Sequence, residues 1–268
     1  MKPKKPIYIF LHLPKNGGTS FTANLEKKLG HEKIAVSKNI RKLSEIQKRN
    51  VFVVSGHENY YGVHEEFPGR EPGYIVFIRD PAERRVSQYN HDIARMNSNK
   101  KPSFKKWYKL QIKDEQTFLL NKKFKGIPGR KAPKFTNNFI SKFKVGNSKT
   151  LKLLGYKVLK IYDFFRKGKR NKESEFENAK RLLENCWTVS TTDNLDKNIP
   201  KIFRAMGLDT KWEKYRTAKS QGEKTSKEKK EVKKSFELDE ETRNKIYKDN
   251  PYDVRIYEFA KELETVSE

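Results

Sequence analysis

The residues best suited to chemistry near the N-terminus form a short loop between an apolar run and a helix-like pattern. The loop contains a lysine, an asparagine, two glycines and two hydroxyl residues: Lys15, Asn16, Gly17, Gly18, Thr19 and Ser20. A helix N-terminus offers unpaired N–H groups and a positive dipole, so a loop that leads into one is a ready anion site. The glycines let the backbone wrap closely around an anion, the lysine adds positive charge, and the hydroxyls can donate hydrogen bonds. The pattern therefore indicates an anion site; a tight turn with a conveniently placed lysine is the alternative.

The order of these residues argues against a nucleoside-triphosphate site. In the Walker A pattern, G-x-x-x-x-G-K-[ST], the lysine follows the glycines, whereas Lys15 precedes Gly17 and Gly18. A nucleotide kinase or a GTPase-like protein, which needs a metal-bound triphosphate, is therefore disfavoured. One cysteine, Cys186, and five scattered histidines give no spacing that would close a metal site, so we expect no metal.

A second group of polar residues follows a later apolar run. Arg79 comes directly after this run, and Asp80 and Pro81 have the types preferred at the start of a helix, which would carry Ser87. Ligands of open α/β sheets bind at the carboxyl ends of the strands, where Arg79 would emerge. A guanidinium matches a phosphate with two parallel hydrogen bonds, and Ser87 could donate another. The pattern predicts a second phosphate contact; an ion pair of Arg79 with Asp80 or Glu83 is the alternative.

A reaction that removes a proton from a hydroxyl group needs a general base, and His57 is the first candidate. It follows the apolar segment 51–55, so it would emerge at the same sheet edge as Lys15 and Arg79. A histidine titrates near neutral pH and suits proton removal. The alternative is that His57 only caps or packs a loop.

Aromatic residues follow this candidate in the sequence: Tyr60, Tyr61 and Phe67. Sugars often lie on aromatic faces, so these residues could line a cleft that binds a sugar, but packing in the core explains them equally well. His12 ends the first apolar run, and we expect it to pack rather than to react.

These residues need a sheet to bring them together, and the apolar pattern predicts one. Compact apolar runs predict buried strands at residues 7–12, 51–55, 74–78 and 187–190. Helices are predicted over 19–30, from 81 onward, over 173–185, up to Met206, and near the end, where Ile256, Phe259, Ala260 and Leu263 form a helical stripe. Residues 217–234 have almost no apolar content and are expected to face solvent. Alternating strands and helices predict an α/β fold with a central, mainly parallel sheet flanked by helices.

Both polar groups resemble the donor-binding motifs of PAPS-dependent carbohydrate sulfotransferases of the heparan sulfate 2-O type (sulfotransferase family 2). LPKNGGTS resembles their 5′-phosphosulfate loop, P-K-[TC]-[GA]-[GS]-T-[ST], with Asn16 in place of the more usual threonine. The string from Arg79 to Ser87, R-D-P-x-x-R-x-x-S, resembles their 3′-phosphate segment. Two such loops in the right order identify the chain as a member of this family.

Weaker matches extend the resemblance over roughly residues 7–264. Residues 185–207 resemble a strand and helix of the family, and the string 215–219 stands where these enzymes carry a basic loop near the donor, which makes Arg216 a donor-binding candidate. Around His57 the family has an H-G-H stretch whose histidines are implicated as the base. Ser55 replaces the first of them, so only His57 carries over. Related branches of the superfamily use a glutamate after this strand, which makes Glu58 the rival of His57 as the base.

The resemblance implies a P-loop-like three-layer fold in a single domain over residues 1–268. The donor-binding core would span about residues 7–95 and 185–215, with helical and acceptor-side elements at 96–184 and C-terminal helices at 236–264. The donor would be PAPS (3′-phosphoadenosine 5′-phosphosulfate), the product PAP, and no metal would take part. Sulfuryl transfer to a hydroxyl of a carbohydrate would proceed by in-line displacement, with Lys15 near the leaving phosphate, Arg79 and Ser87 on the 3′-phosphate, and His57 as base.

The net charge of +26 attracts polyanions, so the acceptor could be an acidic glycan. A non-catalytic protein that binds a polyanion, either glycan or nucleic acid, is the alternative function, but it leaves the two donor loops unexplained. We therefore expect no specific nucleic-acid partner. A lysine-rich compositional bias would explain the charge equally well.

The sequence begins MKPKKPIYIFLHLPKNGG, which has no signal-peptide h-region, and no segment approaches the ~18 apolar residues of a membrane span. A single cysteine excludes an intrachain disulfide. These features predict a soluble, cytoplasmic protein without a membrane span, and they leave its oligomeric state open.

Overall fold

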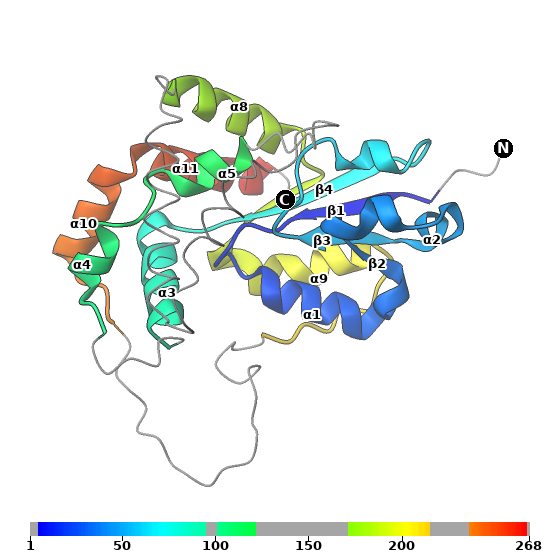
Figure 1. Ribbon diagram of the computed structural model, residues 1–268, viewed down its shortest axis with the longest axis horizontal. Coiled ribbons are helices and arrows are strands. Elements are labelled where there is room, and N and C mark those ends of the chain that lie inside the picture. Colours follow the sequence, from blue (N-terminus) through cyan, green and yellow to red (C-terminus); the bar gives the residue numbers. More distant parts are fainter. Residues whose placement is uncertain (1–4, 95–100, 122–170, 215–235, 267–268) are drawn as a thin grey trace, which may run out of the picture.

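A five-stranded parallel sheet forms the centre of the computed structural model, which describes residues 5–94, 101–121, 171–214 and 236–266 (Figure 1). Its strands are β1 (Ile7–Leu11), β2 (Ile34–Val36), β3 (Val53–Gly56), β4 (Pro72–Ile78) and β5 (Thr188–Thr191), in the order β2-β3-β1-β4-β5. Every neighbouring pair is parallel. The α/β fold predicted from the sequence, with its central parallel sheet, is therefore confirmed.

The three central strands end nearly level with one another, which decides where the loops after them lie. Leu11, the last residue of β1, pairs with Gly56 at the end of β3 and with Val76 near the end of β4. Because parallel strands have their carboxyl ends on one edge, the loops after β3, β1 and β4 leave the sheet side by side, in that order.

Two helices cover one face of the sheet: α1 (Gly18–Leu29) and α9 (Leu195–Ala205) (Figure 1). Phe21 and Leu25 of α1 are fully buried and belong to the core cluster on this face. The Phe21 ring packs against Phe10 and Phe77 of the strands and against Phe203 of α9. These large aromatic side chains supply much of the buried apolar area that holds this layer to the sheet.

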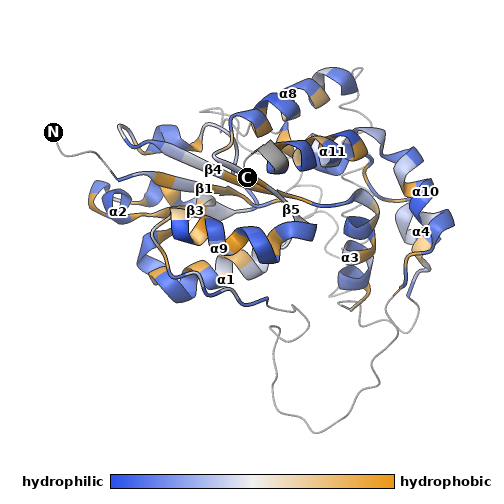
Figure 2. Ribbon diagram, turned by 180° about the vertical axis from the view of Figure 1, so that it is seen from behind, coloured by the Kyte–Doolittle hydropathy of each residue, from blue (hydrophilic) through white to orange (hydrophobic). Residues whose placement is uncertain are grey.

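In the described part of the chain, three helices cover the opposite face: α5 (Glu115–Leu120), α8 (Lys172–Glu184) and α11 (Pro251–Val266) (Figure 1). The predicted stripe of α11 faces the core, since Ile256 and Ala260 are fully buried and Phe259 and Leu263 pack against the same cluster. Hydrophobic residues concentrate along the strands and on the helix surfaces that face them (Figure 2). The sheet is thus the middle of three layers.

Three further helices stand beyond the carboxyl edge of the sheet: α3 (Pro81–Ala94), α4 (Phe104–Tyr108) and α10 (Glu240–Asp249) (Figure 1). Phe104, Trp107 and Ile246 are buried together where these helices meet. The start of α3 agrees with the prediction, because Asp80 Oδ1 accepts a hydrogen bond from the backbone N–H of Glu83 at 2.8 Å.

Residues 31–50 contain elements that the sequence pattern does not predict: the 3-10 helices η1 (His31–Lys33) and η2 (Ser37–Lys42), the strand β2 and the helix α2 (Glu45–Asn50). Two more 3-10 helices are η3 (Val63–Glu66) and η4 (Thr192–Asn194). Residues 217–234, expected to face solvent, lie outside the described residues. Within the described ranges, no helix combines the length and the apolar character needed to cross a membrane.

Candidate active site

Three loops meet at the carboxyl edge of the sheet, and each carries a residue that the sequence analysis singles out. The loop after β1 holds Lys15, the loop after β3 holds His57, and Arg79 follows β4 directly. Because the strands lie in the order β3-β1-β4, the Lys15 loop lies between the His57 loop and Arg79. The structure therefore brings all three residues to one edge, as their positions after strands predict.

The loop after β1 has an unusual backbone. Lys15 has a φ of 69° and Gly17 a φ of 80°, both in the left-handed region that favours glycine. Gly17 is the N-cap of α1, which begins at Gly18. A Cβ atom at Gly17 would lie 2.6 Å from Leu195, and one at Gly18 would lie 2.2 Å from the His12 ring. Both glycines are thus required by close packing, and the loop presents the first-turn amides of α1, which have no carbonyl partner within the helix.

Two arginines hold carbonyl groups of this loop. Nη1 of Arg79 donates to the carbonyl of Lys15 at 3.2 Å, and Nε of Arg84 donates to the carbonyl of Pro14 at 3.1 Å. Both arginines belong to the segment that follows β4, so the two carbonyls point toward that segment. Two guanidinium groups therefore lie directly beside the turn that could receive an anion.

Arg79 combines a largely buried guanidinium with acidic neighbours. Its side chain is 27% exposed, and Nη2 lies 3.8 Å from Oε2 of Glu83. Burial lowers the pKa of Arg79, whereas the nearby Glu83, Asp193 and Asp80 act to raise it. The ion pair considered as the alternative role of Arg79 is thus present, at a distance too long for a hydrogen bond. Ser87 lies one helical turn after Glu83 on α3, so both are on the same helix face.

Glu115, the first residue of α5, bridges two buried arginines of α3. Its Oε2 lies 2.9 Å from Nη1 of Arg84 and 2.6 Å from Nη1 of Arg85, and each arginine side chain is 1% exposed. Burial alone would raise the pKa of Glu115, but the two guanidinium groups lower it to about 2. Nη2 of Arg84 is buried, and among the described residues it has no hydrogen-bond partner. The carboxylate of Glu115 thus holds both arginines side by side behind the loop.

The other residues of the loop differ in what they can offer a ligand. The Asn16 side chain is buried, and its Nδ2 donates to the carbonyl of Phe77 at 2.7 Å and to Oε1 of Gln116 at 2.8 Å. This side chain is directed into the protein, whereas the backbone of Asn16 belongs to the loop that leads into α1. Thr19 is exposed and Ser20 is buried at the start of α1.

His57 is exposed and is held by one of its two ring nitrogens. Nδ1 lies 2.9 Å from the carbonyl oxygen of His12. Because a carbonyl only accepts hydrogen bonds, Nδ1 carries the proton in this contact, and Nε2 is the basic nitrogen of the neutral ring. Asn59 ties the same loop to the sheet, since its Nδ2 donates to the carbonyls of Phe10 at 2.6 Å and Val54 at 3.1 Å. Glu58, the second candidate base, is also exposed.

His12 lies between two other rings, with centroid distances of 4.0 Å to His57 and 5.1 Å to Phe10. Burial and the neighbouring His57 lower the pKa of His12 to about 3, so its ring is neutral at physiological pH. These are the contacts expected of a packing residue. Ser55, where the resembled family has its first histidine, contacts Thr22 of α1 instead, with 2.9 Å between the two hydroxyl oxygens.

A cavity of about 280 Å³ lies beside His57. Tyr60, Tyr61 and Pro14 line it together with leucines of α5 and α8. It therefore touches both the loop of the candidate base and the loop of Lys15. Phe67, considered as a lining residue from its position in the sequence, is 2% exposed and belongs to the core, so the packing alternative holds for it.

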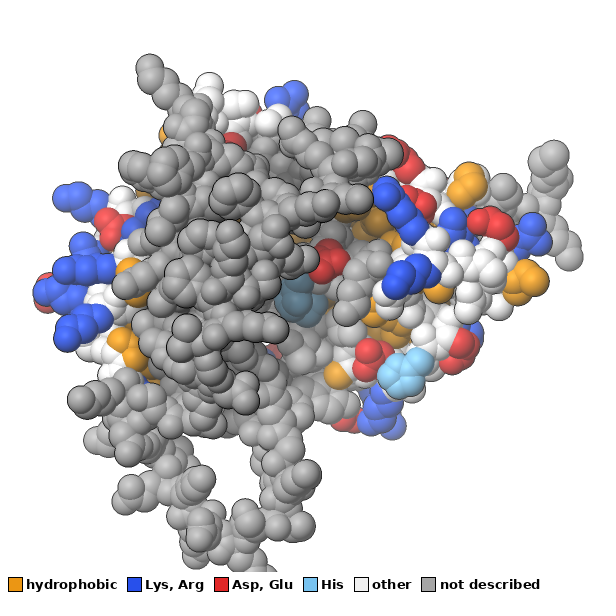
Figure 3. All heavy atoms as spheres, in the orientation of Figure 1, with side chains coloured by type: hydrophobic (Ala, Val, Ile, Leu, Met, Phe, Trp, Pro, Cys, Tyr) orange, Lys and Arg blue, Asp and Glu red, His pale blue; other side chains and the backbone are white. Residues whose placement is uncertain are grey.

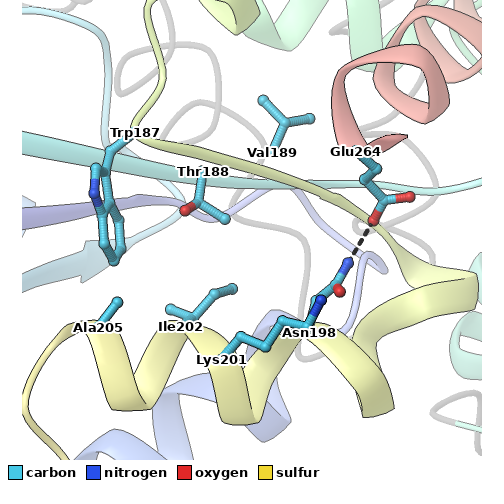
Figure 4. A pocket seen from close by; sticks show the side chains of 8 residues that line it. All are labelled: Trp187, Thr188, Val189, Asn198, Lys201, Ile202, Ala205 and Glu264. Atoms are coloured by element: carbon cyan, nitrogen blue, oxygen red, sulfur yellow. Dashed lines mark hydrogen bonds between the residues drawn. The ribbon is translucent and has the colours of Figure 1, made fainter. Parts of the chain in front are cut away.

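A second cavity, of about 160 Å³, lies between β5, α9 and α11 (Figure 4). Glu264 lines it, and the carboxylate of Glu264 accepts hydrogen bonds from Asn198 at 2.9 Å, Ser190 at 2.8 Å and the backbone of Thr191 at 2.6 Å. This carboxylate fastens α11 to β5 and α9. The residues that line this cavity include none from the three loops at the carboxyl edge.

Two residues whose side chains contact the loops of the candidate site are not identified from the sequence. Arg84 is the second arginine of R-D-P-x-x-R, so its fixed offset from Arg79 could have drawn attention to it. Gln116 lies in a polar segment without periodicity, and nothing in the sequence distinguishes it. Arg216 lies outside the described residues, as does the rest of the string 215–219. In the part of the chain that the structure describes, no group of three or more His, Cys, Asp or Glu side chains could hold a metal ion.

Comparison with known families gives a match that spans most of the chain. A family model described as "Sulfotransferase family" matches residues 1–260. Comparison with curated proteins finds no match.

Proposed function

Because the chain belongs to the sulfotransferase family, we propose that it transfers a sulfuryl group from PAPS to a hydroxyl of a carbohydrate. Sulfuryl transfer in general follows from membership of the family. The donor, the acceptor class and the base are the parts proposed for this chain.

One observation carries the proposed donor: the Arg79 guanidinium and the Lys15 loop lie within hydrogen-bond distance of each other at one sheet edge. PAPS is a nucleotide with anionic groups at two ends. The first-turn amides of α1 and Lys15 suit the 5′-phosphosulfate, and Arg79 with Ser87 suits the 3′-phosphate. Arg84, whose guanidinium holds the carbonyl of Pro14, adds positive charge behind the 5′ end.

The proposed reaction develops negative charge on the leaving phosphate and releases the proton of the acceptor hydroxyl, and a residue is available for each. As the acceptor oxygen bonds to sulfur, the bond between sulfur and the bridging phosphate oxygen breaks in line with it. Lys15 and the loop amides stabilise the negative charge that develops on the leaving phosphate. Nε2 of His57 accepts the proton of the acceptor hydroxyl. His12 supports this role from behind, because its carbonyl fixes Nδ1 as the protonated nitrogen.

The cavity beside His57 supports a ring-shaped acceptor. Its volume of about 280 Å³ suits one sugar unit, and Tyr60 and Tyr61 provide aromatic faces together with hydroxyl groups. We propose that the unit to be sulfated enters here, with its hydroxyl directed at His57.

The distribution of charge supports an acidic glycan. Residues 122–170 contain 16 Lys and Arg against one Asp, so the positive excess is concentrated in the sequence and is not an even compositional bias. On the visible part of the described surface, Lys and Arg side chains also gather over α4 and α10, at the left edge of Figure 3. The exposed lysines of these helices and their ends are Lys105, Lys106, Lys109, Lys245 and Lys248. Such a surface would hold the acidic units that flank the reacting sugar.

A thermal-shift experiment tests the donor. Saturating PAP should raise the melting temperature strongly, whereas ATP with magnesium should have little effect, because a ligand stabilises the state that binds it. Heparin fragments are added in a third measurement, because they test binding of a polyanion. Stronger stabilisation by ATP with magnesium would contradict the proposal, and stabilisation by heparin alone would favour a non-catalytic polyanion-binding protein. Transfer of labelled sulfate from PAPS to a panel of glycans and small alcohols then tests the acceptor class.

A further inference from the structure

Gln116 contacts both of the loops proposed to bind the donor. It is the second residue of α5 and is fully buried. Its Oε1 accepts a hydrogen bond at 2.8 Å from Nδ2 of Asn16, in the loop proposed to bind the 5′-phosphosulfate of the donor. The same oxygen accepts a hydrogen bond at 3.1 Å from the backbone N–H of Arg79, in the segment proposed to bind the 3′-phosphate. One side chain therefore joins two segments that are far apart in the sequence.

The amide of Gln116 also completes the backbone pairing of Arg79. Its Nε2 donates to the carbonyl of Arg79 at 2.8 Å, so the N–H and the C=O of Arg79 both pair with one side chain. Arg79 comes just after the end of β4, where strand pairing stops. Gln116 thus takes the place of a neighbouring strand and holds the backbone from which the guanidinium extends.

Gln116 is itself held by a pair of helix caps that two helices exchange. The carboxylate of Asp253, in α11, accepts hydrogen bonds from the backbone N–H groups of Gln116 at 3.1 Å and Thr117 at 2.8 Å. In return, Oδ1 of Asp114 accepts hydrogen bonds from the backbone N–H groups of Tyr252 at 3.0 Å and Asp253 at 3.3 Å. Each helix therefore caps the other, which leaves Gln116 little freedom to move.

We propose that Gln116 is a positioning residue that fixes the separation of the two donor loops, so that both anionic ends of the nucleotide bind at once. This inference rests on the proposed function, because it assumes a donor with a 5′ and a 3′ anionic end. When two binding elements are held at the right distance, engagement of the first raises the effective concentration of the second. Loss of Gln116 should therefore weaken ligands with two anionic ends and spare ligands with one.

Calorimetric titration with three nucleotides tests this: PAP, adenosine 5′-monophosphate and adenosine 3′-monophosphate. Gln116→Met removes all three contacts without adding charge. In this variant the ratio of affinities for PAP and the 5′-monophosphate should fall by about tenfold, the scale of one or two lost hydrogen bonds. Both monophosphates should keep their affinities within about twofold. Gln111→Met is the matched control, since the Gln111 side chain bonds to the carbonyl of Trp107 in its own segment.

A second variant, Asn16→Ala, removes the hydrogen bond between Asn16 and Gln116 and leaves the pairing of Gln116 with Arg79 in place. It should also lower the ratio of affinities for PAP and adenosine 5′-monophosphate. This variant tests the inference even if Gln116→Met does not fold. An equal loss of affinity for all three nucleotides would make Gln116 a purely structural residue and overturn the inference. An unchanged ratio in both variants would overturn it as well. If the wild-type protein does not bind PAP, the proposed donor itself is wrong, and this result is visible before any variant is measured.

Discussion

The guanidinium of Arg79 and the backbone carbonyl of Lys15 are joined by a hydrogen bond of 3.2 Å, although the residues lie 64 positions apart in the sequence. The side chain proposed for the 3′-phosphate therefore also supports the loop proposed for the 5′-phosphosulfate. A change at Arg79 should be felt at both ends of the nucleotide, but most at the 3′ end.

Arg79→Lys keeps the charge and removes the planar fork. We expect the affinity for PAP to fall by about 10- to 100-fold, because paired hydrogen bonds to a charged group are lost. The affinity for adenosine 5′-monophosphate should fall much less. Calorimetric titration measures both, with Arg181→Lys as control, since Arg181 bonds only to neighbours on α8 in its described hydrogen bonds. Equal losses for the two nucleotides would contradict the assignment of Arg79 to the 3′-phosphate.

Lys15→Ala should act on turnover more than on binding. The lysine is proposed to stabilise charge that develops only as the sulfuryl group leaves, so kcat should fall on the order of 10²- to 10³-fold. The affinity for PAP should fall by a smaller factor. Lys33→Ala is the control, because Lys33 is exposed just before β2, at the opposite edge of the sheet. A turnover close to that of the wild type would remove Lys15 from the proposed mechanism.

His57→Ala and Glu58→Gln separate the two candidate bases. If His57 is the base, its loss should lower kcat by about 10²- to 10⁴-fold and leave the affinity for PAP unchanged. Glu58→Gln should keep most of the turnover. Labelled-PAPS transfer gives the rates, and calorimetry gives the affinities. The opposite pattern would make Glu58 the base.

His12→Phe tests the buried neutral ring through the pH dependence of stability. Burial and His57 lower the pKa of His12 from its ordinary value of 6.5 to about 3. Between these pH values the unfolded chain binds a proton at His12 that the folded chain does not. The free energy of unfolding should therefore decrease as the pH falls through this window, by up to about 1.4 kcal/mol per pH unit from His12.

In His12→Phe this contribution is absent, so its free energy of unfolding should change less steeply with pH than that of the wild type. Urea unfolding at a series of pH values measures both slopes. The comparison uses slopes because the larger phenyl ring would change the packing, and hence the stability, at every pH. Equal slopes would mean that His12 takes up its proton equally well in the folded protein.

The order of strands and helices could be predicted because its signals are local. Runs such as residues 7–11 and 74–78 are apolar throughout because helices cover both faces of the sheet, and the stripe of α11 repeats at the spacing of one helix face. The convergence of Lys15, His57 and Arg79 follows from the same pattern, since each comes just after a parallel strand. β2 was missed because it has three residues and only Ala35 of them is buried.

The side chains that hold the loops of the candidate site in place could not be predicted, because their contacts join segments that are distant in the sequence. Gln116 meets Asn16 across 100 positions of sequence, and a single glutamine in a polar segment has no pattern that reveals its partner. The same holds for Asn59, which bonds to the carbonyl of Phe10. The direction of the Asn16 side chain could not be predicted either, because nothing in the loop indicates which way a buried amide turns.

The exchange of caps between α5 and α11 also sets an order of events during synthesis. Both donor motifs and Gln116 leave the ribosome well before Asp253, the carboxylate that holds the start of α5, since 137 positions separate Asp253 from Gln116. The hydrogen bonds from the backbone of α5 to Asp253 can therefore form only after α11 has emerged. A translation product that stops before α11 would contain both motifs proposed to bind the donor but would lack the carboxylate that holds the start of α5.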